Sequence, residues 1–300
     1  MDIGIDVGSV TIKLVALKNG VVILSDYRQH RGDPLGEASE LLRLMHRSGL
    51  STYRSLCVTG SGRNLISRHL PVDIVKNEIT ALWKAATTLT AGAKTVFEIG
   101  GQDSKIIAME DGEITDFRLN SVCAAGTGSF LDQQAYRIGL SLGELSVRAE
   151  DAVNPAKFTG RCTVFVETEM INLQQRGYPV EAIASGLFDA VCENFLNDLG
   201  AGIPIEDPII FCGGVSRINA VRKAFEKKLG KRLVVPEMNT LMAAFGAALI
   251  AGEHREKDGA PGRRLPDEVT RGVPGGTLRG CDRGDCLNCG RCDGFFSKNR

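Results

Sequence analysis

The sequence VGSVTIKLVALKNG at residues 7–20 recurs in outline as IGGQDSKIIAMEDG at residues 99–112. The two stretches align without a gap at an offset of 92 residues, which places Gly8 on Gly100, Lys13 on Lys105, Ala16 on Ala108 and Gly20 on Gly112. Each stretch runs from a glycine turn into an apolar strand and ends in Asn-Gly or Asp-Gly, the pairs that favour tight β-hairpins. A repeated unit of this kind predicts two related domains.

The remainder of the chain alternates between strand and helix patterns, which predicts an α/β protein. Helices are expected at 34–48, 76–90, 127–150, 165–176, 180–200, 219–229 and 240–252, and further strands at 55–59, 208–215 and 232–236. We expect one domain over 1–91 and a second over 92–252, with the last helix returning to the first domain. Residues 253–280 are rich in Gly, Pro and charge and read as a linker, and a cysteine-rich tail occupies 281–300.

Composition excludes several classes of protein. The 300 residues are 43% hydrophobic and 24% charged, as in an ordinary globular protein. Lys plus Arg and Asp plus Glu both number 36, so no charge excess indicates binding to nucleic acid or to a membrane surface. No apolar run is long enough for a membrane helix, and the N-terminus enters a strand without a signal-peptide pattern. Nine cysteines in such a chain predict metal or redox chemistry in the cytoplasm.

Three glycine sites predict a phosphate-binding cleft. Glycines let backbone N–H groups approach phosphate closely, a lysine on the following strand adds positive charge, and Asp6 and Asp103 suit Mg²⁺. Gln102 could orient a hydrolytic water, and Gly213-Gly214 permits close approach of a base or sugar. A Walker A motif is absent, and GTGSFL lacks the third glycine of a dinucleotide-binding turn. The candidate residues are Asp6, Gly8, Ser9, Val10, Thr11, Lys13, Gly100, Gly101, Gln102, Asp103, Gly213 and Gly214, with Gln102 and Asp103 as the catalytic pair.

The motifs DVGS, GSGRN, IGGQD, CAAGTG, RCTVF with a following ETE, CGGV and FGAALIAG together resemble a known family over residues 1–252. This family comprises the ATPase activators of 2-hydroxyacyl-CoA dehydratases and the ATPase subunits of benzoyl-CoA reductases (BadF/BadG/BcrA/BcrD type). The resemblance implies a duplicated actin-like, ribonuclease H-like ATPase fold in which two domains close on ATP. Val10 departs from the pattern, since a hydroxyl residue is usual there, and the cysteine-rich tail lies outside it.

Cys123 and Cys162 both precede predicted helices, whose N-termini favour a thiolate or an anionic cluster. The residues alone leave open buried packing cysteines or a disulfide. The resemblance implies a [4Fe–4S] cluster that bridges a homodimer, with both cysteines contributed by each subunit.

The other cysteines fall into two groups. Cys57, Cys192 and Cys212 lie in apolar runs and are expected to be packing residues. In the tail, four cysteines crowd into twelve residues, which predicts a metal site: a second Fe–S cluster in preference to zinc. These tail residues are Cys281, Cys286, Cys289 and Cys292.

The resemblance implies an ATP-dependent reductive activase of anaerobic metabolism, which couples ATP hydrolysis to electron transfer into an Fe–S dehydratase or reductase. Ferredoxin or flavodoxin would serve as the electron donor. Two alternatives remain open at this point: a small-molecule kinase of the same fold, and a nucleotide-gated interaction module with a zinc-binding tail.

Overall fold

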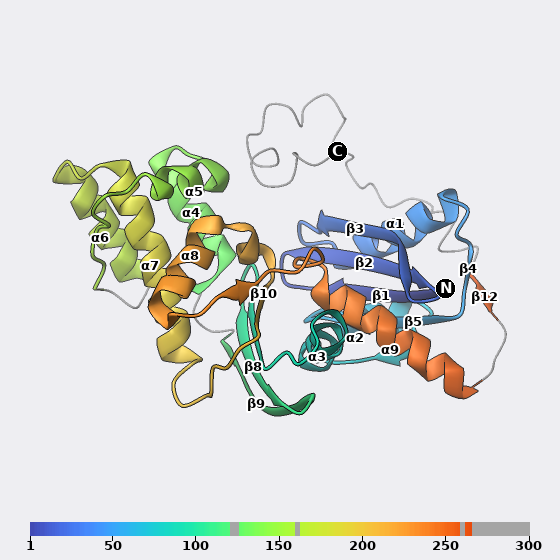
Figure 1. Ribbon diagram of the computed structural model, residues 1–300. Coiled ribbons are helices and arrows are strands. Elements are labelled where there is room, and N and C mark those ends of the chain that lie inside the picture. Colours follow the sequence, from blue (N-terminus) through green and yellow to red (C-terminus); the bar gives the residue numbers. More distant parts are fainter. Residues whose placement is uncertain (121–125, 160–162, 259–261, 266–300) are drawn as a thin grey trace.

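The computed structural model describes residues 1–120, 126–159, 163–258 and 262–265, and it contains two mixed five-stranded sheets (Figure 1). In the N-terminal sheet the order is β3-β2-β1-β5-β6. The strands β1, β2 and β3 are antiparallel neighbours, whereas β1, β5 and β6 run parallel. These strands are β1 (Asp2–Val7), β2 (Thr11–Lys18), β3 (Val21–Gln29), β5 (Ser55–Thr59) and β6 (Ile74–Val75).

The second sheet repeats the topology of the first. Its order is β11-β10-β7-β8-β9, with β7, β8 and β9 antiparallel and β7, β10 and β11 parallel. Each of its strands therefore takes the place of one strand in the N-terminal sheet, and the predicted duplication is confirmed. The strands are β7 (Thr95–Ile99), β8 (Ser104–Glu110), β9 (Glu113–Asn120), β10 (Ile209–Cys212) and β11 (Leu233–Val234).

The two leading hairpins agree residue by residue at the 92-residue offset. The Gly8 N–H donates to the Thr11 carbonyl and the Gly100 N–H to the Asp103 carbonyl, each over 2.9 Å. The register shifts after Ala16 in one hairpin and after Ala108 in the other. The turns Asn19-Gly20 and Asp111-Gly112 both have positive φ at the two residues, as a type I′ turn requires.

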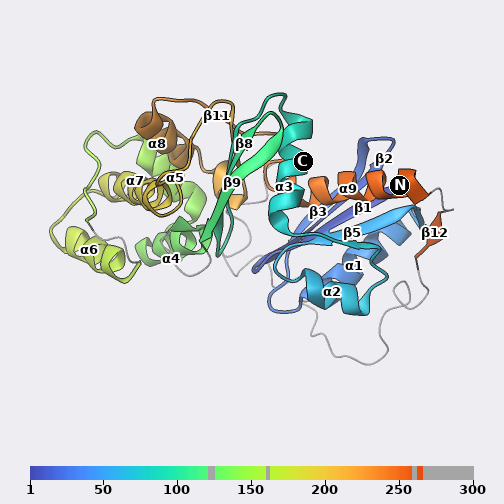
Figure 2. The ribbon, with the colours of Figure 1, turned by 90° about the horizontal axis from the view of Figure 1, so that it is seen from below.

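Two helices, α3 (Glu78–Leu89) and α9 (Met242–Asp258), form a middle layer between the sheets (Figures 1 and 2). Their apolar side chains share one buried core cluster with Val15 of β2, Val96 of β7 and Ile107 of β8. The approach of α9 to the first sheet is close, since a Cβ at Gly4 would lie 2.0 Å from the Ala244 carbonyl oxygen. Both sheets therefore rest on the same pair of helices.

Trp83, the only tryptophan of the chain, joins this middle layer to the second hairpin. Its indole Nε1–H on α3 donates to the Gly112 carbonyl oxygen in the β8–β9 turn, over 2.7 Å.

Helices cover the outer face of each sheet. On the first, α1 (Pro34–Arg47) and α2 (Arg63–His69) pack on β1, β2 and β5. On the second, the core contains four phenylalanine rings, Phe97, Phe195, Phe211 and Phe225, with neighbouring centroids 4.9 to 5.5 Å apart. The covering elements there are α4 (Gly128–Ile138), α5 (Leu142–Glu150), α6 (Thr163–Gln175), α7 (Val180–Asp198), the 3₁₀ turn η2 (Gly214–Arg217) and α8 (Asn219–Leu229).

Three predicted elements differ from the structure. The strand expected at 208–215 ends at Cys212, because Gly213 adopts φ +86° and the 3₁₀ turn η2 begins at Gly214. The helix expected at 127–150 is divided into α4 and α5, because Gly139 adopts φ +81° and Ser141 starts a new helix with a capping box to Glu144. The helix expected to end at 252 continues to Asp258, since Glu, His, Arg and Lys all tolerate a helix and the next Gly comes at 259. Beyond it, β12 (Arg263–Arg264) pairs with β4 (Thr52–Tyr53), within the stretch predicted as a linker.

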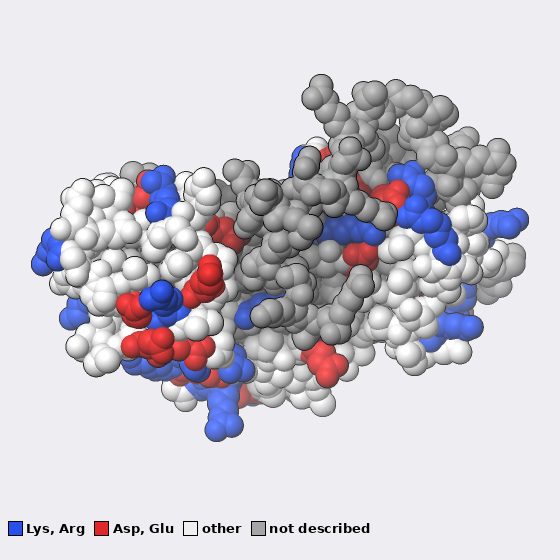
Figure 3. Space-filling model, turned by 90° about the horizontal axis from the view of Figure 1, so that it is seen from above, with Lys and Arg blue, Asp and Glu red and all other residues white. Residues whose placement is uncertain are grey.

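Charged side chains of both signs are interspersed on the face shown in Figure 3, where the described surface has no large patch of a single sign. Within the described residues, no helix is both long and apolar enough to span a membrane.

We predict effects of different size for the same substitution at two glycines of α9. A Cβ at Gly246 would lie 1.8 Å from the Ala81 carbonyl oxygen of α3, whereas at Gly252 the nearest atom is a carboxylate oxygen of Asp2 at 3.3 Å. Gly246→Ala should therefore destabilise the fold by about 1–3 kcal/mol or more through overpacking. Gly252→Ala should be near neutral, because a helix-propensity gain of about 1 kcal/mol is offset by the close approach to the Asp2 carboxylate, which Arg54 holds in place. Urea unfolding of both variants measures the difference, and equal effects would contradict the tight α3–α9 contact.

Candidate functional site

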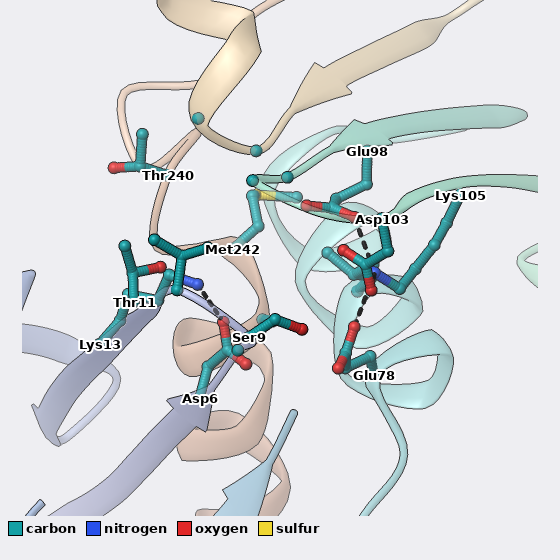
Figure 4. Close-up of a pocket in the computed structure, with 18 of the residues that line it drawn as sticks. Asp6, Ser9, Thr11, Lys13, Glu78, Glu98, Asp103, Lys105, Thr240 and Met242 are labelled. Atoms are coloured by element: carbon teal, nitrogen blue, oxygen red, sulfur yellow. Dashed lines mark hydrogen bonds and ion pairs between the residues drawn. The ribbon is translucent and has the colours of Figure 1, made fainter. Parts of the chain in front are cut away.

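A cleft of about 610 Å³ lies where the two leading hairpins face each other above the N-termini of α3 and α9 (Figure 4). All of the residues predicted to bind or act on a nucleotide line this cleft. From the first hairpin these are Asp6, Gly8, Ser9, Val10, Thr11 and Lys13; from the second, Gly100, Gly101, Gln102 and Asp103; and after β10, Gly213 and Gly214. Residues about 200 positions apart in sequence thus share one site.

The glycine turns of the two hairpins touch across the cleft. A Cβ at Gly101 would lie 3.0 Å from Cγ2 of Val10, so the Val10 side chain packs on the opposite turn. The second turn is also fixed from behind, because its carbonyl oxygens at Gly100 and Gly101 accept 2.9 Å hydrogen bonds from the N–H groups of Gly128 and Ser129 at the start of α4. The two turns therefore meet at the mouth of the cleft, and one of them is bonded to a helix.

Gly213 is a position that only glycine can fill. Its φ is +86°, and a Cβ there would lie 2.3 Å from the Ile99 carbonyl oxygen. Gly60, which follows β5 in the first sheet, has φ +97° and the same 2.3 Å approach to the Val7 carbonyl. The Gly213 N–H donates to the Asn239 carbonyl, which ties this turn to the loop before α9.

The inner face of the first hairpin carries one partly buried ion pair. Lys13 Nζ donates to Asp6 over 2.8 Å, and its charge lies 5.7 Å from the centroid of the Tyr27 ring. Burial alone lowers the pKa of Lys13, but the Asp6 carboxylate more than offsets this and raises the pKa above its ordinary value. Lys13 is therefore held in its charged form.

The second hairpin repeats this pair and adds two carboxylates. Lys105 contacts Glu98 at 2.9 Å, Asp103 at 2.9 Å and Glu78 of α3 at 2.7 Å. Burial opposes the charge of Lys105, yet its three carboxylate neighbours raise its pKa. Burial raises the pKa of Glu98 to about 7 and also raises that of Glu78, in both cases against the lowering effect of Lys105.

The lining of the cleft carries four carboxylates and two lysines, so its surplus reaches two negative charges only when Glu98 and Glu78, whose pKa values are raised, are both ionised. Carboxylate oxygens are the protein ligands that Mg²⁺ prefers, and Mg²⁺ is usually held by only one or two of them, with water and phosphate completing its shell. Asp6 and Asp103 are therefore suited to the ion, and its charge would offset the surplus. Within the described ranges, no group of three or more His, Cys, Asp or Glu side chains is arranged to hold a metal without such help.

Part of this site was not predicted from the sequence. Glu98 and Lys105 were detectable, since the 92-residue offset places Asp6 on Glu98 and Lys13 on Lys105, and the sheet register pairs each acid with its lysine. Glu78 carries no such signal, because it lies in the first turn of α3 and reaches the cleft only through tertiary packing. The remaining unpredicted lining residues are Tyr27, Leu82, Asn239, Thr240, Met242 and Ala243.

A second cavity of about 1230 Å³ adjoins the cleft and shares Val10, Thr11, Tyr27, Gly100, Gly101 and Gly214 with it. We call it the groove. Its other walls come from α4, the start of α5 and η2, and they are largely apolar. The two cavities together offer a polar end with glycine turns and an apolar end, as a nucleotide requires.

Only some of the cysteines singled out in the sequence lie within the described residues. Cys57, Cys192 and Cys212 are buried and free, as expected of packing residues, and burial raises the pKa of Cys57 to about 12. The predicted cluster ligands Cys123 and Cys162 lie outside the described residues. The same is true of Cys281, Cys286, Cys289 and Cys292.

Comparison with known proteins identifies similar chains. A model of the BadF/BadG/BcrA/BcrD ATPase family matches residues 3–251. The chain is 31% identical over 253 residues to the (R)-2-hydroxyglutaryl-CoA dehydratase activating ATPase of Acidaminococcus fermentans, covering 83% of this chain and 96% of the relative. It is 26% identical over 271 residues to one of the benzoyl-CoA reductase subunits of Thauera aromatica, covering 85% of this chain and 94% of the relative.

Among solved structures, the activator of the 2-hydroxyisocaproyl-CoA dehydratase from Clostridium difficile with bound ADPNP is similar, with a TM-score of 0.80 at 28% identity. The match covers 86% of this chain and 96% of that one. The resemblance inferred from the motifs and the duplicated α/β fold that it implied are thus confirmed.

We predict that the two equivalent lysines differ in their importance for stability. Lys105→Met would leave three partly buried carboxylates without their cation, whereas Lys13→Met would leave one. Removing one partner of a buried ion pair costs about 3–5 kcal/mol, so Lys105→Met should be the more damaging by at least about 1 kcal/mol. Denaturant unfolding of both variants in the absence of Mg²⁺ measures this, and an equal loss would show that the cluster does not depend on Lys105.

We also predict a pH-dependent effect of Glu98→Gln. The pKa of Glu98 is raised to about 7, so the folded protein retains a proton that the unfolded chain has lost above its ordinary pKa. The contribution of Glu98 to the free energy of unfolding is therefore fully present below about pH 4.5, and it is lost as the pH rises to about 7. Lys105 stays charged over this range. Glu78 and Asp103 are present in the wild type and in the Glu98→Gln variant, so the difference in stability between the two proteins reports on Glu98.

Glu98→Gln should accordingly be close to the wild type in stability at pH 4.5 and exceed it at pH 8. Urea unfolding at the two pH values tests this. A stability difference that is the same at both would mean that Glu98 does not titrate near neutrality.

Proposed function

Because the chain belongs to the BadF/BadG/BcrA/BcrD ATPase family, we propose that it is an ATP-hydrolysing activator that delivers low-potential electrons to an iron–sulfur dehydratase or reductase. The observation that carries the proposal is the cleft itself, in which two equivalent glycine turns from two equivalent sheets face each other over a buried cluster of acids and lysines. Such a cleft holds a phosphate chain between two bodies that can move relative to each other.

The triphosphate would lie between the turns at Gly8–Thr11 and Gly100–Asp103, with the nucleoside in the groove beside Gly214. Backbone N–H groups of the turns would contact phosphate oxygens, and the N-termini of α3 and α9 would add favourable dipoles. Since Val10 carries no hydroxyl, its contribution is its backbone N–H and its contact with Gly101. Asp6 and Asp103 would hold Mg²⁺, which supplies charge neutralisation at the phosphate oxygens when bound.

Hydrolysis requires a positioned water molecule beside the terminal phosphate. Gln102 would orient this water, and Asp103 would accept its proton or hold the water through the metal shell. Asp103 is itself held by the 2.9 Å contact with Lys105, which fixes the direction of its carboxylate. The second hairpin thus provides both proposed catalytic groups.

The hydrogen bonds from Gly128 and Ser129 suggest how the nucleotide acts at a distance. When loss of the terminal phosphate lets the turn at Gly100-Gly101 move, α4 has to move with it, because its first N–H groups are bonded to that turn. Helix α4 is also tied to α6 by the ion pair between Arg137 and Glu167, at 2.8 Å. In sequence, Cys123 precedes α4 and Cys162 directly precedes α6.

We therefore propose that α4 and α6 carry the redox centre. A [4Fe–4S] cluster held by Cys123 and Cys162 of both subunits in a homodimer supplies one-electron chemistry at low potential when bound. The electron donor would be ferredoxin or flavodoxin, and the site of action the cytoplasm. The tail cysteines would hold a second Fe–S cluster or a zinc ion.

The test compares Asp103→Asn with Asp111→Asn. Asp103→Asn should lower the ATPase rate by at least about 100-fold, since it removes a catalytic carboxylate. Asp111→Asn makes the same chemical change in the hairpin turn, where the equivalent position of the first repeat already carries Asn19, and it should keep full activity. Unchanged turnover in Asp103→Asn would remove Asp103 from the mechanism.

The same preparations, purified anaerobically, are analysed for iron, acid-labile sulfide and zinc. A bridging cluster predicts about two irons per chain in the wild type and in both variants, and a further cluster in each tail raises this to about six. If iron and sulfide are absent even after anaerobic reconstitution, the electron-transfer role fails, and a kinase or a nucleotide-gated interaction module becomes the better explanation of the cleft.

A further inference from the structure

His30 follows β3 and lies beside the first glycine turn, where the proposed mechanism gives it no role. Its ring lies between two backbone groups: Nε2 is 3.0 Å from the Gly8 carbonyl oxygen, and Nδ1 is 3.2 Å from the Gly32 nitrogen. A carbonyl oxygen only accepts a hydrogen bond and a backbone N–H only donates one, so Nε2 carries the ring proton and Nδ1 is the acceptor. His30 therefore donates to the first residue of the turn.

The backbone of His30 holds the same turn at a second point. Its N–H donates to the Val10 carbonyl oxygen over 3.2 Å, just past the last register pair of β2 and β3. The Gly8 N–H donates to the Thr11 carbonyl, but the reverse bond, from the Thr11 N–H to the Gly8 carbonyl, is not formed in this hairpin. The turn is thus open, and His30 supplies the donor that a closed β-turn would take from its own backbone.

These two bonds fix the direction of two N–H groups. In a planar trans peptide the C=O and the N–H of one unit point in opposite directions. A Gly8 carbonyl held toward His30 points the Ser9 N–H away from His30, and the Val10 carbonyl does the same for the Thr11 N–H. The four residues of the turn line the cleft, whereas His30 is not among the described residues of its lining. The two N–H groups therefore point toward the side of the turn on which phosphates would lie.

The loop after β3 keeps the imidazole in this place. The Asp33 N–H donates to the His30 carbonyl over 2.7 Å, and the two residues between them, Arg31 and Gly32, have φ of +47° and +89°. Positive φ is uncommon at a residue other than glycine, so this tight reversal is a specific feature of the loop. It brings the Gly32 N–H against Nδ1, and a flipped ring would lose both of its hydrogen bonds.

The equivalent turn of the second hairpin is held without a side chain. Gly100, which corresponds to Gly8 at the 92-residue offset, gives its carbonyl to the Gly128 N–H of α4. One phosphate turn is therefore bonded to a helix backbone and the other to an imidazole. The contact of the first turn can be removed by a single substitution that leaves the cleft lining unchanged.

We propose that His30 is a positioning residue for nucleotide binding: by holding the Gly8 carbonyl, it presents the N–H groups of Ser9 and Thr11 to the phosphate chain. The inference rests on the proposed function, since it takes the turn to bind phosphate. Its effect falls on binding and not on hydrolysis, because both proposed catalytic groups belong to the second hairpin.

The experiment measures KM and kcat for Mg²⁺-ATP hydrolysis by the full chain and its variants. His30→Ala should raise KM at least about tenfold, the effect of losing a hydrogen bond to a charged group, and should keep kcat within about threefold of the wild type. His30→Gln, whose side-chain amide can donate to the Gly8 carbonyl, should keep KM within about threefold. His69→Ala is the matched control, since His69 also contacts a backbone carbonyl, that of Leu65 at 2.9 Å, but on α2 and outside the cleft.

The division between KM and kcat separates positioning from a structural defect. A partly misfolded preparation has fewer active molecules, so its apparent kcat falls while KM stays unchanged. An unchanged KM in His30→Ala, a KM in His30→Gln as high as that of His30→Ala, or an equal rise in His69→Ala overturns this inference and leaves the proposed function intact. A wild type that does not hydrolyse ATP overturns the proposed function, and this inference falls with it.

Discussion

The structure depends on burying charge between two sheets. In each leading hairpin the strand register places an acid opposite a lysine, Asp6 with Lys13 and Glu98 with Lys105, on the face that meets the middle helices. Buried charges are tolerated only when they are paired and hydrogen-bonded, so the hairpins, the glycine turns and the ends of α3 and α9 have to close around them. On the first hairpin one lysine is paired with one carboxylate, whereas on the second one lysine contacts three carboxylates. This asymmetry gives an otherwise symmetric fold one end suited to a cation.

Much of this architecture could be predicted from short stretches of sequence. The Asn-Gly and Asp-Gly turns, the 92-residue offset and the glycine pairs predicted the two hairpins and the phosphate turns, because local backbone chemistry determines them. Glu78 was not predicted because its place in the site depends on how α3 packs in the tertiary structure. The break at Gly139 was missed because apolar periodicity continues across it, while a single positive φ interrupts the backbone.

The connection between the cleft and the second half of the molecule is made by backbone groups. The carbonyls of Gly100 and Gly101 accept the first N–H groups of α4, so the same two residues line the cleft on one side and hold a helix on the other. Side-chain substitutions leave such a connection in place. Its geometry is therefore insensitive to the local sequence, provided that the two glycines remain.

The hydrogen bond between Trp83 and Gly112 has a practical consequence. The chain has a single tryptophan, and its indole spans the boundary between the shared middle layer and the hairpin of the second sheet. Any rotation of that sheet about α3 lengthens or breaks this bond and changes the solvent around the ring. The intrinsic emission of Trp83 is therefore a built-in optical reporter of the angle between the two halves, readable in stopped flow without a label and without altering any residue of the cleft.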